Sequence, residues 1–347
     1  MPSGRVAVVA PFPPPLGGMA HQANILAGYL EGEGLTVHRV CATRFRNILP
    51  FRDVAALHRF WSLRDEFAVV NIHTCCYLSY FGTTVPIIWL AKRLGKRVVV
   101  TYKGGSAREV FTLTGEFGLR WLRMADAVTV PSGFLRDVFR GFNLETRIIH
   151  NLYEAGLPAE PPHRPNADAP RLAMTRGIGH YYNVPCTVRA FQIVQRRYPK
   201  AQLLLAGSGN RERQVRNLVR RLCVPNVAFL GQQGRTQIYE LYRSADIMVN
   251  SSDVDNFPGA LLEAFLFGVP IATTNAGGIP YMVEHGVTAR VVERNDHEAL
   301  AREIMYLLEH PDVAQEQARA AQASAEQYQW EAVRASWLDV LFPSAST

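Results

Sequence analysis

Short runs of β-branched and other apolar residues recur along the whole chain, and each is followed by turn residues and then by helical periodicity. Parallel strands that helices cover on both faces have this near-continuous apolar pattern. A segment with five prolines, residues 156–170, divides the predicted strands into two sets. The first set is 6–10, 35–40, 67–73, 97–102, 127–130 and 146–150, and the second is 171–175, 201–207, 227–231, 245–251, 269–274 and 289–292.

Two sets of six strands predict an α/β protein with two Rossmann-like, doubly wound parallel-sheet domains. A length of 347 residues suits two hydrophobic cores. We expect an N-terminal domain at 1–155, a linker at 156–170 and a C-terminal domain at 171–325. The remaining residues, 326–347, carry Trp330 and Trp337 at helical spacing. They predict an amphipathic helix that packs back on the domains.

Composition narrows the class of partner. The chain is 48% hydrophobic and 19% charged, as a globular protein is, and its formal net charge of +7 suits an anionic ligand such as a nucleotide. The basic residues are not interleaved with aromatic residues as in nucleic-acid binders, so no nucleic acid is expected. The basic segment 44–61 would suit a lipid-linked acceptor at a membrane surface, but a solvated basic face is the default reading.

Five cysteines without C-x-x-C spacing indicate free thiols in a reducing compartment. No apolar stretch is long enough to span a bilayer, and the N-terminal residues lack the apolar core of a signal peptide. We therefore expect a cytoplasmic protein, or one bound peripherally to the cytosolic face of the membrane.

The loops that follow the strands are where a ligand is expected, because open parallel sheets bind ligands beyond the carboxyl ends of their strands. Gly17 and Gly18 follow the first strand and open a helix, which exposes backbone N–H groups to an anion; a simple tight turn explains the pair equally well. Pro258 suits the first position of another helix, and the N–H groups of residues 259–261 would then be free to meet a diphosphate.

Two acids, Asp255 and Glu263, lie on either side of Pro258. One carboxylate can accept hydrogen bonds from sugar hydroxyls and the other from ribose hydroxyls. Taken alone, Asp255 can also be explained as a solvated acid in a loop, and Glu263 as a capping residue in a helical turn. The nearby loop at Gly277 and Gly278 favours the binding interpretation.

This pattern resembles the retaining glycosyltransferases of family 4. Their motif of an acid, seven residues and Glu, continued by Ala, Gly and Pro, is filled here from Asp255 to Pro270, with Asp in place of the first Glu. Further matches are the Gly17-Gly18 loop, PSGFLRDVF, Arg176, LLLAGSG, VAFLG and NAGGIPYMV. The resemblance runs from residue 5 to about residue 340.

The resemblance implies the GT-B fold, with two Rossmann-like domains facing across a cleft. It implies retaining transfer of a sugar from a nucleotide diphosphate sugar to a glycan, lipid-linked or small-molecule acceptor, in polysaccharide or glycoconjugate biosynthesis, with no metal and no other cofactor. The C-terminal domain would hold the donor and the N-terminal domain the acceptor. The implied donor-binding residues are Gly17, Gly18, Arg176, Tyr182, Phe257, Gly259, Ala260, Leu261 and Glu263, and the implied catalytic residues are Asp255, Lys103 and Arg176.

Two departures keep alternatives open. Lys103 stands where the family commonly has His, and Tyr182 stands near the position of a common Lys. Lys103 can replace a lost cation, but the same exchanges suit a noncatalytic nucleotide-sugar binding protein. Asp253 and Asp255 also form a D-x-D triplet, which would suit a metal-dependent sugar transferase. A nucleotide-dependent dehydrogenase is disfavoured because no complete glycine fingerprint is present.

Overall fold

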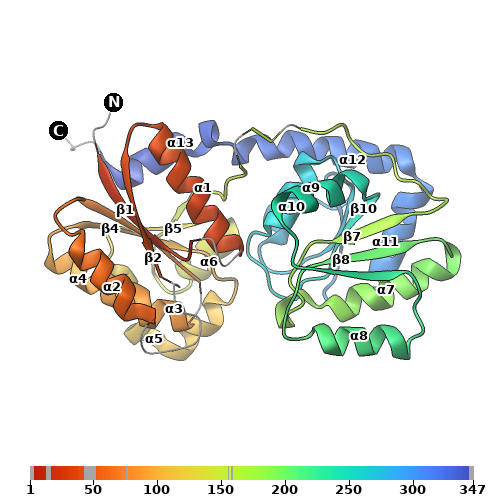
Figure 1. Cartoon of the computed structure of the whole chain (residues 1–347), viewed down its shortest axis with the longest axis horizontal. Coiled ribbons are helices and arrows are strands. Elements are labelled where there is room, and N and C mark those ends of the chain that lie inside the picture. The colour runs from red at the N-terminus through yellow and green to blue at the C-terminus, as the bar shows by residue number, and fades with distance from the viewer. Residues whose placement is uncertain are drawn as a thin grey trace. The chain divides into compact units, whose positions relative to one another are not determined.

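The computed structural model describes residues 4–12, 17–42, 52–75, 77–154, 156–157 and 159–343. The chain forms two compact units (Figure 1). Unit 1 comprises Met1–Glu154 with Gln327–Thr347, and unit 2 comprises Ala155–Glu326. Part of the basic segment 44–61 and part of the first glycine loop lie outside the described residues.

Unit 1 is built on a six-stranded sheet in the order β2-β1-β3-β4-β5-β6, and all its strand pairs are parallel. This order, with β1 inside the sheet, is that of a doubly wound fold. The strands are β1 (Arg5–Ala10), β2 (Thr36–Cys41), β3 (Val69–Thr74), β4 (Arg97–Tyr102), β5 (Ala127–Val130) and β6 (Arg147–Ile148).

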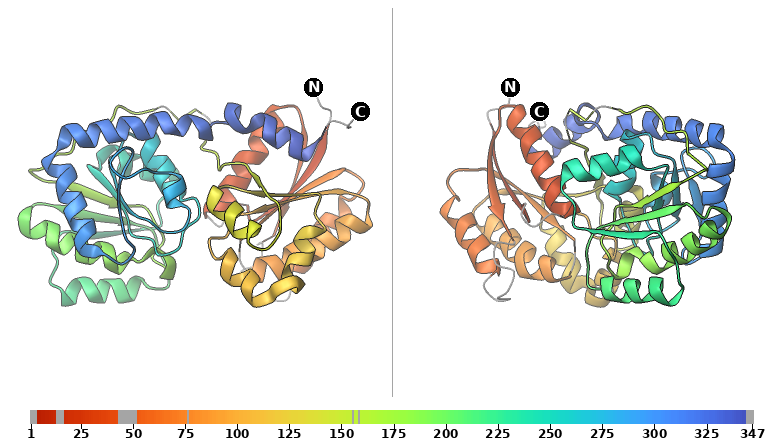
Figure 2. Two further views of the ribbon diagram at one scale, coloured as in Figure 1. Left: turned by 180° about the vertical axis from the view of Figure 1, so that it is seen from behind. Right: turned by 45° about the vertical axis from the view of Figure 1, so that its right-hand side comes forward.

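Helices cover both faces of this sheet (Figure 2). The helices are α1 (Gly18–Gly32), α2 (Arg52–Ser62), α3 (Tyr77–Ser79), the π-helical turn η2 (Tyr80–Thr84), α4 (Val85–Arg93), α5 (Ala107–Arg123), α6 (Gly133–Arg140) and α13 (Trp330–Leu341). Successive residues of β1 point to opposite faces. Ala7 and Val9 pack with residues of α2, α4, α5 and α6, whereas Val6 and Val8 pack with residues of α1 and α13.

The C-terminal helix α13 belongs to the core of unit 1. Trp330 and Trp337 are 5% and 3% exposed and join the cluster beneath α1. The Trp330 ring stacks on Tyr29 with centroids 5.0 Å apart, and its indole N–H donates to Glu33 (2.9 Å). The end of the chain therefore completes the hydrophobic core that begins with the first strand.

Unit 2 repeats the architecture. Its six parallel strands are ordered β12-β11-β10-β7-β8-β9. They are β7 (Arg171–Met174), β8 (Gln202–Ala206), β9 (Val227–Gly231), β10 (Ile247–Asn250), β11 (Ile271–Thr274) and β12 (Arg290–Val292). The helices are α7 (Val184–Arg197), α8 (Glu212–Arg221), α9 (Arg235–Ser244), α10 (Gly259–Leu266), α11 (His297–Glu309) and α12 (Pro311–Ser324), with 3-10 turns at η3 (His180–Tyr182) and η4 (Ile279–Tyr281). A further 3-10 turn, η5 (Ala325–Tyr328), spans the boundary between unit 2 and the C-terminal part of unit 1.

The proline-rich segment between the two strand sets runs along unit 2. The Glu160 amide donates to the carbonyl of Leu266 (2.9 Å), and the His163 amide donates to that of Gly268 (2.7 Å). A Cβ at Gly268, where φ is +60°, would lie 2.7 Å from the Cα of Pro162. A glycine is therefore required where this segment crosses the end of α10.

All twelve predicted strands are present, and the predicted fold class of two doubly wound α/β domains is confirmed. Among the helices that the structure describes, none combines the length and apolar character needed to cross a bilayer.

Candidate active site

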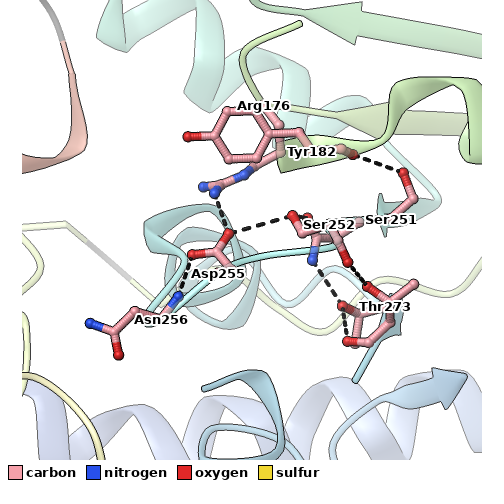
Figure 3. Close-up of polar contacts among 9 residues, drawn as sticks. Arg176, Tyr182, Ser251, Ser252, Asp255, Asn256 and Thr273 are labelled. Atoms are coloured by element: carbon pink, nitrogen blue, oxygen red, sulfur yellow. Dashed lines mark hydrogen bonds and ion pairs between the residues drawn. The ribbon is translucent and has the colours of Figure 1, made fainter. Parts of the chain in front are cut away.

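The carboxyl ends of the unit 2 strands meet at one edge of the sheet, where charged side chains from separate loops come together (Figure 3). Arg176 follows β7, and Asp255 lies in the loop after β10. The Arg176 guanidinium donates to the Asp255 carboxylate, and the two side chains are only 13% and 11% exposed. The Tyr182 ring lies over the guanidinium, with 4.3 Å between Cζ and the ring centroid. These three predicted site residues therefore form one cluster.

The Asp255 carboxylate is also held by its own loop. It accepts from the Asn256 amide at 2.9 Å and from the Ser252 hydroxyl at 3.4 Å. Burial raises the pKa of Asp255, although the charge of Arg176 opposes that shift. An ionised Asp255 thus depends on Arg176, since an unpaired carboxylate at this depth would be costly.

The loop after β11 packs against the loop around Asp255 and forms hydrogen bonds with it. The Gly278 amide donates to the carbonyl of Asp255 at 3.0 Å. A Cβ at Gly278 would collide with the carbonyl oxygen of Asn256, so the two backbones can approach only because residue 278 is glycine. The Thr274 hydroxyl donates to the Ser252 carbonyl at 2.6 Å. The position of Asp255 is therefore fixed by backbone contacts on both sides.

Two further glycines shape the loop that carries Arg176. A Cβ at Gly207 would collide with the carbonyl oxygen of Arg176, and a Cβ at Gly209 would collide with that of Ile178. The Ile178 amide donates to the Ser208 carbonyl at 3.1 Å. The Gly-Ser-Gly stretch, which is not a complete dinucleotide fingerprint, thus lets the β8 loop support the Arg176 loop.

Glu263 forms a second carboxylate–arginine pair. It lies on α10 and accepts from Arg235 Nη1 and from the Tyr242 hydroxyl, both at 3.1 Å. Burial raises the pKa of Glu263, and the charge of Arg235 opposes the shift. Tyr242 is fully buried and also donates to the carbonyl of Ala260 at 3.0 Å. Tyr242 therefore links Glu263 to the first turn of α10.

Sequence reasoning missed Arg235 and Tyr242. Arg235 is the first residue of α9, directly after the short loop that follows β9. A search of every loop after a strand for charged side chains, rather than for glycines alone, would have found it. Tyr242 lies inside α9, and its helical position alone gives no signal of a polar role.

The start of α10 differs in detail from the prediction. Pro258 is the N-cap (φ −66°, ψ 114°), and the helix begins at Gly259. The Leu261 amide donates to the Pro258 carbonyl at 3.1 Å, so the expectation that its N–H group is free is wrong: the short turn uses it internally. Gly259 has open space where a Cβ would be. Phe257 and Ala260 are buried, at 7% and 5% exposure.

The remaining predicted residues belong to unit 1. Gly17 caps α1 with an extended backbone, and both Gly17 and Gly18 have open space at the Cβ position. Lys103 follows β4, and its ammonium group donates to Asn151 Oδ1 at 2.7 Å. Removal from water lowers the pKa of Lys103 to about 7. The neighbouring His73 is buried, and this burial together with the charge of Lys103 holds its pKa well below the usual range.

The D-x-D triplet is engaged by nitrogen donors. Asp253 accepts from the Asn183 side chain at 3.0 Å, while Asp255 pairs with Arg176. Within the described ranges, no group of three or more His, Cys, Asp or Glu side chains is arranged to hold a metal ion.

Comparison with known proteins assigns the family. The model for "Glycosyl transferases group 1" matches residues 159–326, which include both carboxylate–arginine pairs. The matched residues make up almost all of unit 2, which is therefore a group 1 glycosyltransferase domain. The predicted family is thereby confirmed, and the structural likenesses below agree with the GT-B fold.

Curated relatives in this family match parts of the chain. N-acetyl-alpha-D-glucosaminyl L-malate synthase of Bacillus anthracis is 33% identical over 135 residues, which is 38% of this chain and 35% of the relative. Glycogen synthase of Mycobacterium tuberculosis is 27% identical over 220 residues, or 61% of this chain and 53% of the relative. The chain thus spans about half or less of the length of these group 1 relatives.

Solved structures match along almost the whole chain. Sucrose-phosphate synthase from Thermosynechococcus elongatus superposes with a TM-score of 0.78 at 18% identity, covering 96% of this chain and 97% of that one. HepE from Anabaena, solved in complex with UDP and glucose, superposes with a TM-score of 0.76 at 17% identity, covering 97% and 99%. At these identities the likeness shows a shared fold alone.

Proposed function

We propose that this protein transfers a sugar from a nucleotide diphosphate sugar to a glycan, lipid-linked or small-molecule acceptor, with retention of anomeric configuration and without a metal. The observation that carries the proposal is the pair of partly buried carboxylate–arginine contacts, Asp255 with Arg176 and Glu263 with Arg235, beside the start of α10. Both contacts lie in the part of the chain that the family model matches.

In this proposal the diphosphate lies at the start of α10. The helix dipole and the amides of Gly259 and Ala260 favour negative charge there. The open space at Gly259 leaves room for a phosphate to approach the backbone. Arg176 supplies a cation beside this helix end, and Tyr182, stacked on its guanidinium, limits the directions in which it can move. Gly17 and Gly18 are proposed as further donor-binding residues, because open space at both Cβ positions lets a ligand approach the backbone.

The two carboxylates take different roles. Glu263, held in place by Arg235 and Tyr242, accepts hydrogen bonds from ribose hydroxyls. Asp255 accepts hydrogen bonds from the donor sugar once the diphosphate has drawn Arg176 toward itself. Because the same guanidinium serves Asp255 and the phosphate, donor binding would release Asp255 for the sugar.

The chemical requirement is to stabilise a leaving group. The bond between the anomeric carbon and the diphosphate oxygen breaks, and the departing diphosphate gains negative charge. A bond forms from the acceptor oxygen to the anomeric carbon, and the acceptor hydroxyl gives up its proton, which the departing diphosphate can accept. Fixed cations and backbone dipoles can meet that charge, as preorganised donors do in other enzymes. Lys103 is proposed as the catalytic cation of unit 1, and with a pKa of about 7 it changes charge near neutral pH.

The geometry of the D-x-D triplet supports the metal-free form of this proposal. Asp253 and Asp255 are each bound to a different nitrogen donor, Asn183 and Arg176, instead of converging on one point. Activity that disappears with a chelator and returns with manganese would contradict metal independence.

The experiment is a panel of nucleotide sugars screened first for thermal stabilisation and then for transfer to a broad acceptor panel. A donor that binds stabilises the protein by mass action, which identifies base and sugar before any acceptor is known. Release of nucleoside diphosphate with the product anomer retained, measured by proton NMR, is the expected result. Donor binding without transfer or hydrolysis across the panel would favour a noncatalytic binding protein, and an inverted product would refute retention.

A further inference from the structure

The surface of unit 1 carries exposed aromatic rings on three helices. Trp61 on α2 is 48% exposed, Trp89 on α4 is 45% exposed and Phe117 on α5 is 57% exposed. By contrast, unit 2 has no tryptophan, and its described phenylalanines are buried or half-buried. The exposed rings of unit 2, Tyr181 and Tyr281, lie on two separate 3-10 turns, η3 and η4. In unit 1 the exposed rings are instead grouped on neighbouring helices, and grouped exposure marks an interaction site more often than scattered exposure does.

These rings lie on helices that cover the same face of the unit 1 sheet (Figures 1 and 2). Helix α4 packs against both α2 and α5. The Phe117 ring stacks on half-buried Phe81 of η2 with centroids 5.8 Å apart, which joins α5 to the turn that leads directly into α4. Leu113 on α5 and Leu78 on the short helix α3, 80% and 68% exposed, add further exposed apolar side chains in this part of unit 1. We name Trp61, Leu78, Trp89, Leu113 and Phe117 the α2–α5 surface.

Each exposed ring of this surface has an arginine stacked on it. Arg64 lies over Trp61, Arg93 over Trp89 and Arg120 over Phe117, each with its guanidinium carbon 4.7 Å from the ring centroid. Within the described part of the chain, no carboxylate lies within ion-pair distance of Arg93 or Arg120. Their charges are therefore open to an external anion.

Basic residues outnumber acidic residues in the surrounding segment. Residues 52–126, which contain all these helices, carry eleven Lys and Arg against six Asp and Glu. Exposed rings beside guanidinium groups match the boundary between lipid headgroups and acyl chains. A ring can enter the apolar side of this boundary while its arginine binds a phosphate on the polar side. An excess of basic residues favours anionic headgroups.

We propose that the α2–α5 surface binds the anionic surface of a lipid bilayer. The rings of Trp61, Trp89 and Phe117 enter the interface, while Arg64, Arg93 and Arg120 bind lipid phosphates. This inference goes beyond sugar transfer, since vesicle binding can be measured without donor or acceptor. Failure of one proposal therefore leaves the other standing.

The test is co-sedimentation of the full chain with vesicles of phosphatidylcholine alone or mixed with phosphatidylglycerol. Binding is expected to the mixed vesicles, and to weaken between about 0.1 M and about 0.5 M NaCl. Replacing Arg93 and Arg120 together by Gln should lower the partition coefficient about thirty-fold, the effect expected for two basic residues at an anionic surface. The matched control replaces Arg213 and Arg221, exposed on α8 of unit 2, by Gln, and should bind nearly as the wild type does.

A second pair of variants tests the rings. Trp89→Ser with Phe117→Ser should weaken binding at both salt concentrations, whereas Tyr281→Ser with Val287→Ser, at exposed positions of unit 2, should not. Equal binding to both vesicle types, or equal loss in a variant and its control, would overturn the proposal. So would concentration-dependent self-association that the ring variants abolish, because the surface would then bind a second copy of the chain.

Discussion

Replacing Asp255 by Asn tests the idea that one guanidinium serves both the protein and the donor. The substitution keeps the size of the side chain and an oxygen that can accept from the Asn256 amide, but it removes the charge that Arg176 now neutralises. We expect the variant to bind nucleoside diphosphates more tightly and to transfer sugar more slowly. Tighter binding follows because Arg176 no longer has to leave a carboxylate, and slower transfer follows because the sugar loses its charged acceptor.

The size of the binding effect follows from Coulomb's law. Two unit charges about 6 Å apart interact by about 3 kcal/mol at an effective dielectric constant of about 20. Removing the repulsion between Asp255 and a bound phosphate should therefore raise affinity by about tenfold to a hundredfold. The buried positive charge left on Arg176 should lower the unfolding free energy of the free protein by about 3 kcal/mol, and saturating ligand should offset part of that loss.

Isothermal titration calorimetry with a panel of nucleoside diphosphates measures the affinity, and urea denaturation measures the stability. The matched control is Asp253→Asn, which makes the same change in net charge two residues away at a carboxylate bound by Asn183. Its effect should be several-fold smaller. Unchanged or weaker binding by a folded Asp255→Asn variant would refute the shared-guanidinium model, as would equal gains in both variants.

Three further outcomes are expected. Glu263→Gln should weaken donor binding by about tenfold, which is the effect of losing a charge-assisted hydrogen bond. The control is Glu160→Gln, at another glutamate of unit 2 that pairs with an arginine, and it should leave the donor affinity measured by calorimetry unchanged. Gly259→Ala should weaken donor binding without lowering the melting temperature, because the Cβ position is open in the free protein. Gly278→Ala should lower the melting temperature, because its Cβ would collide with the Asn256 carbonyl. Equal melting temperatures for the two variants would contradict the close approach of residues 278 and 256. Lys103 has a pKa of about 7 in the folded chain against 10.5 ordinarily, so between these pH values the unfolded chain binds more protons and the unfolding free energy rises with pH. Lys103→Met should abolish this rise and increase the unfolding free energy by about 2–4 kcal/mol at or below pH 7. An unfolding free energy with the same pH dependence in the variant and the wild type would contradict the lowered pKa of Lys103.

The strands were predictable because helices cover both faces of each sheet, so every strand is a run of apolar residues. The ends of the strands were less predictable. The run 146–150 contains only a two-residue strand, Arg147–Ile148, since it pairs at the edge of the sheet. The kink of α5 at Gly115 (φ 52°, ψ −142°) and the π-helical turn between α3 and α4 left no periodic signal.

The site was predictable as a set of residues but not as a set of contacts. Motif positions brought attention to Arg176, Asp255 and Glu263 singly. Their partners come from distant segments: Arg176 and Asp255 are 79 residues apart, and Arg235 and Glu263 are 28 apart. Spacing along a chain cannot show which arginine reaches which carboxylate, because the strand order of the sheet determines that.

The most direct test of the central claim is a crystal structure of the chain with the nucleotide sugar that the thermal screen selects. The account predicts the diphosphate at the Gly259 end of α10 with Arg176 turned toward it, the ribose hydroxyls on Glu263, and the sugar within hydrogen-bond distance of Asp255. A diphosphate bound elsewhere, with the Arg176–Asp255 pair intact, would contradict it.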